Sequence, residues 1–372
     1  MRCRPHVTLH KKYANGVFGA NSPCGSFAPV GVTLYQLIKR IRFEQVTIHV
    51  AGIHIVPPVL LAPMAGITDL PFRKLVARFG AGLVVSEMIA SQEMVQARRG
   101  TREKAELDGG AGLSAVQLAG RDPYWIAEAA RMAEAMGARL IDINMGCPAK
   151  KVVGGLSGSA LMREPDHALR LIEAVVGAVS VPVTLKTRLG WDANSLNAAV
   201  LAHRAQQAGV RMVTVHGRTR CQFYKGRADW SAIAPVVRML DVPVVANGDV
   251  VTPRDARTAL AQSGAAGVMI GRGAQGRPWQ PALVAAALYG TPAPVVPRGA
   301  ALADLVMAHH AGMLEFYGRD LGQRVARKHL GWYMDHAATP PALRREVLTA
   351  PDPATVHRLL PLALAERERF AA

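Results

Sequence analysis

The sequence has 372 residues, half of them hydrophobic in type, and a formal net charge of +17. It contains no run of 18 or more apolar residues, which argues against a transmembrane helix. Its four cysteines, at positions 3, 24, 147 and 221, have neither CxxC spacing nor the density of a disulfide-stabilised protein, so we exclude a disulfide framework and a cysteine zinc site and expect a cytoplasmic protein.

Residues 1–50 carry seven Lys or Arg residues against one acidic residue and show no clear periodicity. No apolar segment with a cleavage site follows a basic start, so a signal peptide is not expected. We predict an N-terminal extension, open to disorder, that either contacts RNA or has no role of its own. A positive net charge attracts phosphate backbones, but a protein from an arginine-rich proteome would show the same excess. Charge alone therefore does not establish nucleic-acid binding, and the sequence motifs are needed.

From residue 59 onwards a unit of apolar strand, Gly- or Pro-containing loop and helical stretch repeats. Most of the apolar runs lack an alternating polar face, which is typical of parallel strands covered on both sides. Helices are predicted over 122–136, 165–179, 195–208 and 253–262, each opening with Asp, Ser or Pro. The eight predicted strands are 59–62, 83–86, 114–118, 140–143, 181–186, 212–216, 242–246 and 267–270.

Eight strand–helix units predict an α/β fold, a (β/α)8 TIM barrel over residues 51–297. A doubly wound sheet is disfavoured because its first turn would read GxGxxG, whereas residues 62–66 here read APMAG.

After Pro297 the strand signal stops. Residues 302–317 and 322–336 predict helices, and we expect a small all-helical C-terminal domain over 298–372. A basic cluster on the second helix fits RNA phosphates, although a solvated helix face would look the same; it consists of Arg324, Arg327, Lys328 and His329. We interpret four further groups as structural: Trp279, His309-His310, Trp332 and Tyr333.

Catalytic groups of this barrel lie in the loops that follow the C-terminal ends of strands. Two glycine loops, Asn247-Gly248-Asp249 and Gly271-Arg272-Gly273, follow strands seven and eight, where the fold commonly binds phosphate. Tight turns alone would also need these glycines. The remaining strand-end residues are Pro63, Met64, Ala65, Gln117, Asn144, Cys147, Lys186, His216 and Arg218.

Lys186 and Cys147 suggest the chemistry. A semi-buried lysine needs an anionic partner, and a flavin supplies one, with Gln117 and His216 in reach of its ring edge. A lone cysteine is more often a small buried hydrophobe, but Cys147 stands at the barrel mouth in a loop fixed by Gly146 and Pro148. Cys221 is a weaker candidate.

These residues resemble the signature blocks of the tRNA-dihydrouridine synthases. The blocks are residues 62–69 (APMAGITD), 142–148 (DINMGCP), 216–220 (HGRTR) and 247–249 (NGD). The run 144–152 (NMGCPAKKV) resembles the bacterial B-type branch. The resemblance covers residues 50–340, and the first fifty residues depart from it.

The resemblance implies an enzyme that uses FMN and NADPH to reduce the C5=C6 bond of a D-loop uridine, uridine 17, in tRNA. Cys147 would be the proton donor. The FMN contacts would be Pro63, Met64, Ala65, Gln117, Lys186, His216, Asn247, Gly248, Asp249, Gly271 and Arg272. We assign tRNA contacts to Asn144, Arg218, Arg324, Arg327 and Lys328.

Reduced FMN would give hydride to uracil C6, and Cys147 would protonate C5; an ordinary thiol is protonated at neutral pH and can serve as this acid. The uridine would have to be extruded from folded tRNA. We expect a monomer without a metal or a membrane partner. Three alternatives stay open: an FMN barrel dehydrogenase for a free pyrimidine such as dihydroorotate, a tRNA-binding barrel without catalysis, and a phosphate-binding isomerase without flavin.

Overall fold

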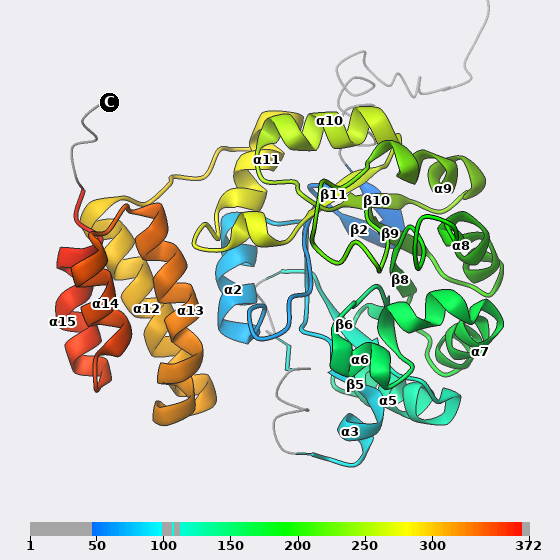
Figure 1. Ribbon diagram of the computed structural model, residues 1–372, viewed down its shortest axis with the longest axis horizontal. Helices are drawn as coiled ribbons and strands as arrows, with labels where there is room; N and C mark the ends of the chain where they lie inside the picture. The colour runs from blue at the N-terminus through cyan, green and yellow to red at the C-terminus, as the bar shows by residue number, and fades with distance from the viewer. Residues whose placement is uncertain (1–46, 99–105, 108–111, 367–372) are drawn as a thin grey trace, which may run out of the picture. The chain divides into compact units, whose positions relative to one another are not determined.

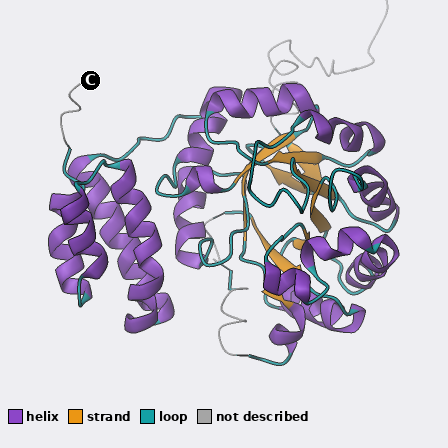
Figure 2. Cartoon of the chain, in the orientation of Figure 1, coloured by secondary structure: helices purple, strands orange, loops and turns teal. Residues whose placement is uncertain are grey.

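The computed structural model describes residues 47–98, 106–107 and 112–366, and these residues belong to one compact unit. Strands lie at the centre of the barrel and helices surround them (Figures 1 and 2). Most of the predicted N-terminal extension, residues 1–46, lies outside the described residues. No helix in the described part of the chain is long and apolar enough to cross a membrane.

Eight parallel strands form a closed ring, which confirms the predicted TIM barrel. Neighbours along the chain pair in order, and the pairings of β11 with β3 and of β4 with β6 close the ring. The strands are β3 (Val59–Leu61), β4 (Leu83–Val85), β6 (Ser114–Ala119), β7 (Ile141–Met145), β8 (Val183–Arg188), β9 (Met212–His216), β10 (Val244–Asn247) and β11 (Gly267–Ile270).

Helices follow the strands as predicted, and acidic or hydroxyl side chains start several of them. Asp69, Asp122 and Thr252 accept hydrogen bonds from the first free backbone amides of α2, α5 and α10. The barrel helices are α2 (Leu70–Phe79), α3 (Ser91–Val95), α5 (Pro123–Ala135), α6 (Lys150–Gly154), α7 (Pro165–Val176), α8 (Ala198–Gln207), α9 (Ala234–Met239), α10 (Pro253–Ser263) and α11 (Gln280–Tyr289), with 3-10 turns η1 (Gly158–Arg163), η2 (Ser231–Ile233) and η3 (Arg272–Ala274).

Three short strands were not predicted. Residues 48–50, assigned from the sequence to the extension, form β1 (Ile48–Val50), which pairs with β2 (Ile53–Ile55); β5 (Ile89–Ala90) pairs with β6. Ile48, Val50 and Ile55 pack in one cluster with residues near the strand starts, such as Leu83 and Met212. The hairpin therefore closes the end of the barrel opposite the predicted site.

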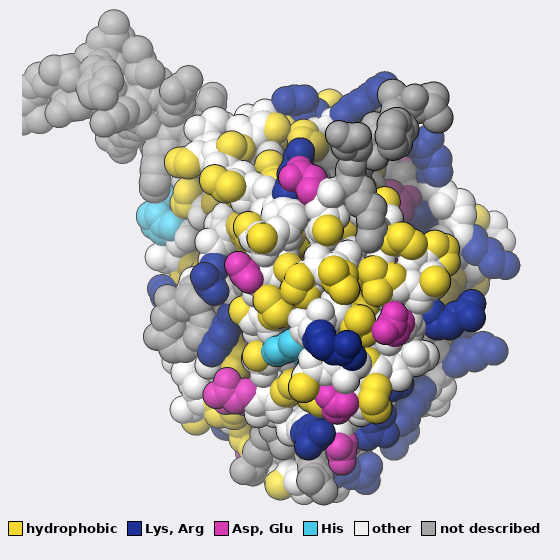
Figure 3. All heavy atoms as spheres, turned by 90° about the vertical axis from the view of Figure 1, so that its left-hand side faces the viewer, with side chains coloured by type: hydrophobic (Ala, Val, Ile, Leu, Met, Phe, Trp, Pro, Cys, Tyr) yellow, Lys and Arg dark blue, Asp and Glu magenta, His cyan; other side chains and the backbone are white. Residues whose placement is uncertain are grey.

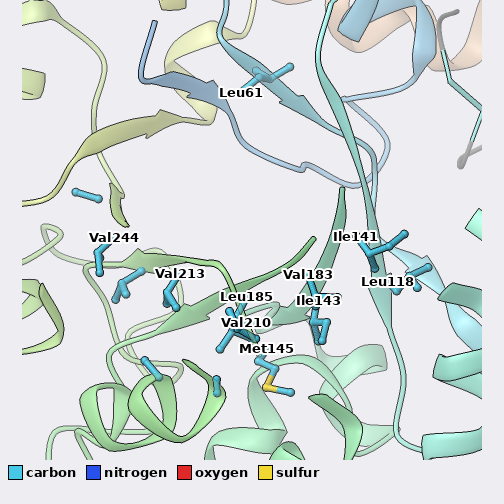
Figure 4. Packing of buried hydrophobic residues seen from close by; sticks show 14 of the residues in the cluster. Leu61, Leu118, Ile141, Ile143, Met145, Val183, Leu185, Val210, Val213 and Val244 are labelled. Atoms are coloured by element: carbon cyan, nitrogen blue, oxygen red, sulfur yellow. The ribbon is translucent and has the colours of Figure 1, made fainter. Parts of the chain in front are cut away.

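Alternation along the strands decides which side chains enter the barrel. Val183 and Leu185 of β8 belong to the cluster between strands and helices, as do Ile141, Ile143 and Met145 of β7 (Figure 4). Because successive side chains of a strand point to opposite faces, the residues between them point into the barrel. These inward residues are Asp142, Asn144, Thr184, Lys186 and Arg188.

Between Pro297 and residue 366, where the described part of the chain ends, all secondary structure is helical, as predicted. It forms α12 (Gly299–Tyr317), α13 (Arg319–His336), α14 (Pro341–Thr349) and α15 (Pro353–Ala363). The core of these helices includes Trp279, which precedes α11 of the barrel. A Cβ on Gly276 would lie 2.4 Å from the Trp332 carbonyl oxygen, so α13 packs directly on the turn after β11. Because the barrel and these helices share packing, the structure shows no separation at residues 297 and 298, and the domain boundary there stays a prediction.

Candidate active site

A cavity of about 340 Å³ opens at the C-terminal ends of the barrel strands. Pockets that hold small molecules commonly have volumes of roughly 300–1,000 Å³. The cavity brings together twelve residues predicted from the sequence: Pro63, Met64, Ala65, Gln117, Asn144, Cys147, Lys186, His216, Asn247, Gly248, Gly271 and Arg272.

A buried hydrogen-bond network fixes the inner wall of the cavity. Gln117 Nε2 donates to Asp142 Oδ2 (2.7 Å), and Gln117 Oε1 accepts from Asn144 Nδ2 (2.7 Å). Thr184 Oγ1 donates to the other Asp142 oxygen at 2.6 Å. Burial raises the pKa of Asp142, while the bonds from Thr184 and Gln117 oppose that shift. The network holds the amides of Gln117 and Asn144 in one orientation.

The loop that carries Cys147 is fixed through its backbone. Asn144 Oδ1 accepts from the Cys147 amide (3.0 Å), and the Cys147 carbonyl accepts from Ser159 Oγ (2.8 Å). Arg188 Nε donates to the carbonyl of Gly146 at 2.7 Å. Cys147 is half-buried, whereas Cys221 is exposed. Asn144, predicted to contact substrate, therefore also positions the cysteine loop.

Lys186 lies at the cavity with its charge poorly compensated. Its Nζ donates to Asn247 Oδ1 (3.1 Å), and Asn247 Nδ2 donates to the Met269 carbonyl (2.8 Å). Burial, followed by the positive charge of Arg188, lowers the pKa of Lys186 to about 8. An anionic group in the cavity would reverse this effect, because it favours the charged lysine.

The glycine loops after β10 and β11 leave a cradle that a side chain would fill. Gly248 has a φ of +110°, and a Cβ there would lie 2.5 Å from His216 Cδ2. Beside it, the exposed Arg272 guanidinium is held by Asp249, Nη2 to Oδ1 at 3.2 Å. Open backbone and a positioned arginine are what a phosphate group requires.

Arg218 lies behind this cradle rather than in the cavity. Its side chain is 1% exposed and bonds Asp249 Oδ2 (2.5 Å) and the Gly226 carbonyl (2.7 Å). Its Nη1 lies 3.3 Å from His216 Nε2. Burial and then Lys186 hold the pKa of His216 well below its usual range, so this imidazole is neutral. The structure thus gives Arg218 a supporting position and no exposed surface for the predicted tRNA contact.

Sequence analysis did not identify four residues that line the cavity: Met88, Arg188, Tyr224 and Gln275. Arg188 is 2% exposed, and its Nη1 donates to the carbonyls of Thr219 and Phe223. Tyr224 is 49% exposed, with the guanidiniums of Arg188 and Arg272 at 5.6 and 5.2 Å from its ring centre. The alternation Thr184, Lys186, Arg188 could have revealed Arg188; a loop tyrosine gives no such signal.

Three of the four basic residues predicted on α13 are exposed: Arg324, Arg327 and Lys328. A Cβ on Gly66 would lie 3.2 Å from Lys328 Nζ, so this lysine reaches the loop that also carries Met64 and Ala65. His329, however, is 1% exposed, and its place in the exposed cluster was wrong because it faces the core. Figure 3 shows Lys and Arg side chains gathered along its right-hand edge.

Comparisons with known proteins agree on one family. The sequence model of a family described as dihydrouridine synthase matches residues 60–367. A probable tRNA-dihydrouridine synthase of Rhodobacter capsulatus is 62% identical over 323 residues, 87% of this chain and 99% of that protein. The tRNA-dihydrouridine synthase B of Vibrio cholerae is 45% identical over 287 residues, 77% of this chain and 89% of the relative.

Solved structures match in fold alone. A 2-naphthoyl-CoA reductase aligns with a TM-score of 0.52 at 12% identity, over 65% of this chain and 52% of the other. A histamine dehydrogenase from Rhizobium aligns with a TM-score of 0.51 at 12% identity, over 73% of this chain and 51% of the other.

Proposed function

Because the chain belongs to the dihydrouridine synthase family, an oxidoreductase family, we propose that it reduces the C5=C6 bond of a D-loop uridine in tRNA, with FMN as cofactor and NADPH as reductant. The observation that carries this proposal is the single cavity that unites Cys147, Lys186 and the glycine cradle. We propose uridine 17 as the target, in line with the resemblance to the B-type branch, and a monomer that acts in the cytoplasm.

The cavity residues fit a flavin mononucleotide. Gly248, Gly271 and Arg272 would hold its phosphate, since a Cβ at Gly248 would fill the cradle. Lys186 and Gln117 would face the polar edge of the ring, and residues 63–65 would frame it. When bound and reduced, the flavin would supply hydride to uracil C6.

Cys147 would complete the reduction. Hydride addition at C6 leaves negative charge on C5 and the C4 oxygen; the Cys147 S–H bond breaks, a C5–H bond forms, and solvent later reprotonates the sulfur. Burial lowers the pKa values of Lys186 and Arg188, and the nearby Cys147 sulfur opposes that shift in both. The two cations would therefore stabilise the sulfur after it has given up its proton.

The four helices after Pro297, α12–α15 (the tail helices), would hold the tRNA. Arg324, Arg327 and Lys328 lie at spacings of three and four residues, so they share one face of α13. Contacts of this kind position a phosphate backbone. The target uridine would be extruded into the cavity, at a cost of a few kcal/mol, where the exposed Tyr224 ring could stack on it.

The test uses the purified full chain and tRNA from cells that lack this gene. We expect about one FMN per chain by absorbance, and NADPH-dependent dihydrouridine at one D-loop position in reverse-transcription stops. Free uridine, orotate and dihydroorotate serve as alternative substrates. A chain without flavin, or one that converts a free pyrimidine while leaving tRNA unchanged, would overturn the proposal.

A further inference from the structure

Three buried metal-binding side chains meet where the C-terminal helices pack on the barrel. Asp69 precedes α2, His309 belongs to α12 and His329 to α13, and their exposed fractions are 2%, 6% and 1%. One potential ligand atom from each lies within 4.8 Å of the others. None of these residues lines the active-site cavity.

Several polar atoms of this cluster are incompletely hydrogen-bonded. Among the described residues, His309 Nε2 has no hydrogen-bond partner, and neither Asp69 Oδ2 nor the ring nitrogens of His329 have a well-aligned one. The Tyr317 hydroxyl contacts the Asp69 carboxyl, and the Ile67 backbone contacts the His329 ring. Leaving a buried polar atom unpaired costs about 1–3 kcal/mol. The Phe72 ring packs at 4.9 Å from the His329 ring. An additional partner inside the cluster would satisfy His309 Nε2 and add to the weak contacts of Asp69 and His329.

The other ends of two of these side chains are already held. Asp69 Oδ1 accepts from the Phe72 amide at 3.0 Å, and His309 Nδ1 lies 3.1 Å from the Tyr333 hydroxyl. Metal-bound histidines commonly use their second nitrogen in this way. If His309 Nδ1–H donates to the Tyr333 oxygen, its Nε2 lone pair is free to coordinate.

Charged and polar side chains surround the cluster. Glu87, Arg73 and Tyr317 also face the Asp69 carboxylate, and Arg73 donates its guanidinium N–H groups to the carbonyls of Thr68 (2.7 Å) and Glu106 (2.6 Å). Burial raises the pKa of Asp69 to about 7, and a cation bound beside it would favour the ionised carboxylate. Burial lowers the pKa values of His309 and His329, so both imidazoles are neutral and able to coordinate.

We propose that Asp69, His309 and His329 bind a zinc ion that ties α12 and α13 to the start of α2, with water at the fourth position. Two imidazoles and a carboxylate are an established zinc ligand set. Ligands of tetrahedral zinc stand about 3.3 Å apart at bond lengths of roughly 2.0 Å. The candidate ligand atoms lie within 4.8 Å of one another, so zinc binding requires these side chains to move closer together. The ion would also fix Lys328, the neighbour of His329, beside the mouth of the barrel.

The test measures metal content of the full chain. The protein is stripped with a chelator, incubated with equimolar Zn²⁺, desalted and analysed by mass spectrometry, beside D69N, H329Q and H310Q. D69N keeps the oxygen that caps α2. H310Q changes the neighbouring buried histidine, which bonds His357 and Gln323 instead. We expect about one zinc per chain in the wild type and H310Q, and at least tenfold less in D69N and H329Q.

A second measurement covers variants that fail to fold. Co²⁺ added to the stripped wild type should give visible bands of a four- or five-coordinate nitrogen–oxygen site, and Zn²⁺ should raise its melting temperature. Less than a tenth of an equivalent of zinc in the loaded wild type would overturn the proposal. Equal zinc in the wild type and in folded D69N would place the ion elsewhere, for example at cysteines, and would also overturn it.

Discussion

The thiol of Cys147 stands at the active-site cavity because backbone hydrogen bonds hold its loop. For this reason Cys147→Ala should leave FMN and tRNA binding nearly unchanged and lower turnover about 10²–10⁴-fold, the usual contribution of a general acid. The measurement is single-turnover reduction of tRNA with pre-reduced enzyme. Cys221→Ala, at an exposed cysteine, is the control and should retain full activity. Full turnover in the Cys147 variant would refute the acid role.

The charge of Lys186 should make FMN affinity depend on pH. The pKa of Lys186 is lowered to about 8, so the side chain is charged below pH 8 and loses its proton as the pH rises. Since a charge-assisted hydrogen bond from the protonated lysine to the polar edge of the flavin ring is stronger than one from the neutral amine, FMN should bind most tightly below pH 8 and more weakly above it. Fluorescence titrations from pH 7 to 9.5 measure this, and Lys186→Met should bind more weakly without the pH dependence. An equal slope in both proteins would contradict the assignment.

The path of the loop after β10 depends on Gly248. A Cβ there would lie 2.5 Å from His216 Cδ2 and 2.8 Å from Ala228 Cβ, at a φ of +110°. We expect Gly248→Ala to weaken FMN binding about tenfold or more and to destabilise the fold by about 1–3 kcal/mol. Gly137→Ala, at φ +94° with no atom within 4 Å, is the matched control; it should lose stability only.

The basic face of α13 should contribute to tRNA binding and not to FMN binding. Replacing Arg324, Arg327 and Lys328 by Ala should raise the KM for tRNA roughly tenfold and leave FMN binding unchanged. The salt dependence of binding should flatten by about one unit for each phosphate that the variant no longer neutralises. The control removes Arg139, Arg211 and Arg238, which are exposed and lie before strand starts at the opposite end of the barrel. If both triple variants had the same effect, α13 would act on tRNA only through its net charge and not through direct phosphate contacts.

At the scale of the whole molecule, the barrel and the tail helices share packing. The tail core contains Trp279 of the barrel, so we expect one unfolding transition in urea, with tryptophan fluorescence and far-ultraviolet circular dichroism coinciding. Leu360→Ala should lower the unfolding free energy by about 2–5 kcal/mol, because Leu360 is fully buried. Leu362 on the same helix is 61% exposed, and its replacement should cost under about 0.5 kcal/mol. A separate early transition of the tail would instead show an independent domain.

The recurrence of eight apolar runs sufficed to predict the barrel, because a parallel strand buried on both faces needs continuous apolar residues. The same pattern did not show where each strand ends. β8 was predicted to end at Lys186, yet it continues to Arg188, since charged side chains that point into the barrel still leave the backbone paired. The hairpin β1–β2 was missed because it precedes the first repeating unit at residue 59, and residues 48–50 were assigned to the extension.

By itself, the sequence determined the fold class, the all-helical tail and most of the cavity residues, because strand ends converge at one rim in any such barrel. Only the tertiary structure decided what each side chain faces. It buried Arg218 against Asp249, turned His329 inward to meet Asp69 and His309, and brought Arg188 beside the Cys147 loop. These outcomes depend on contacts between residues far apart in the chain, and local spacing carries no information about such contacts.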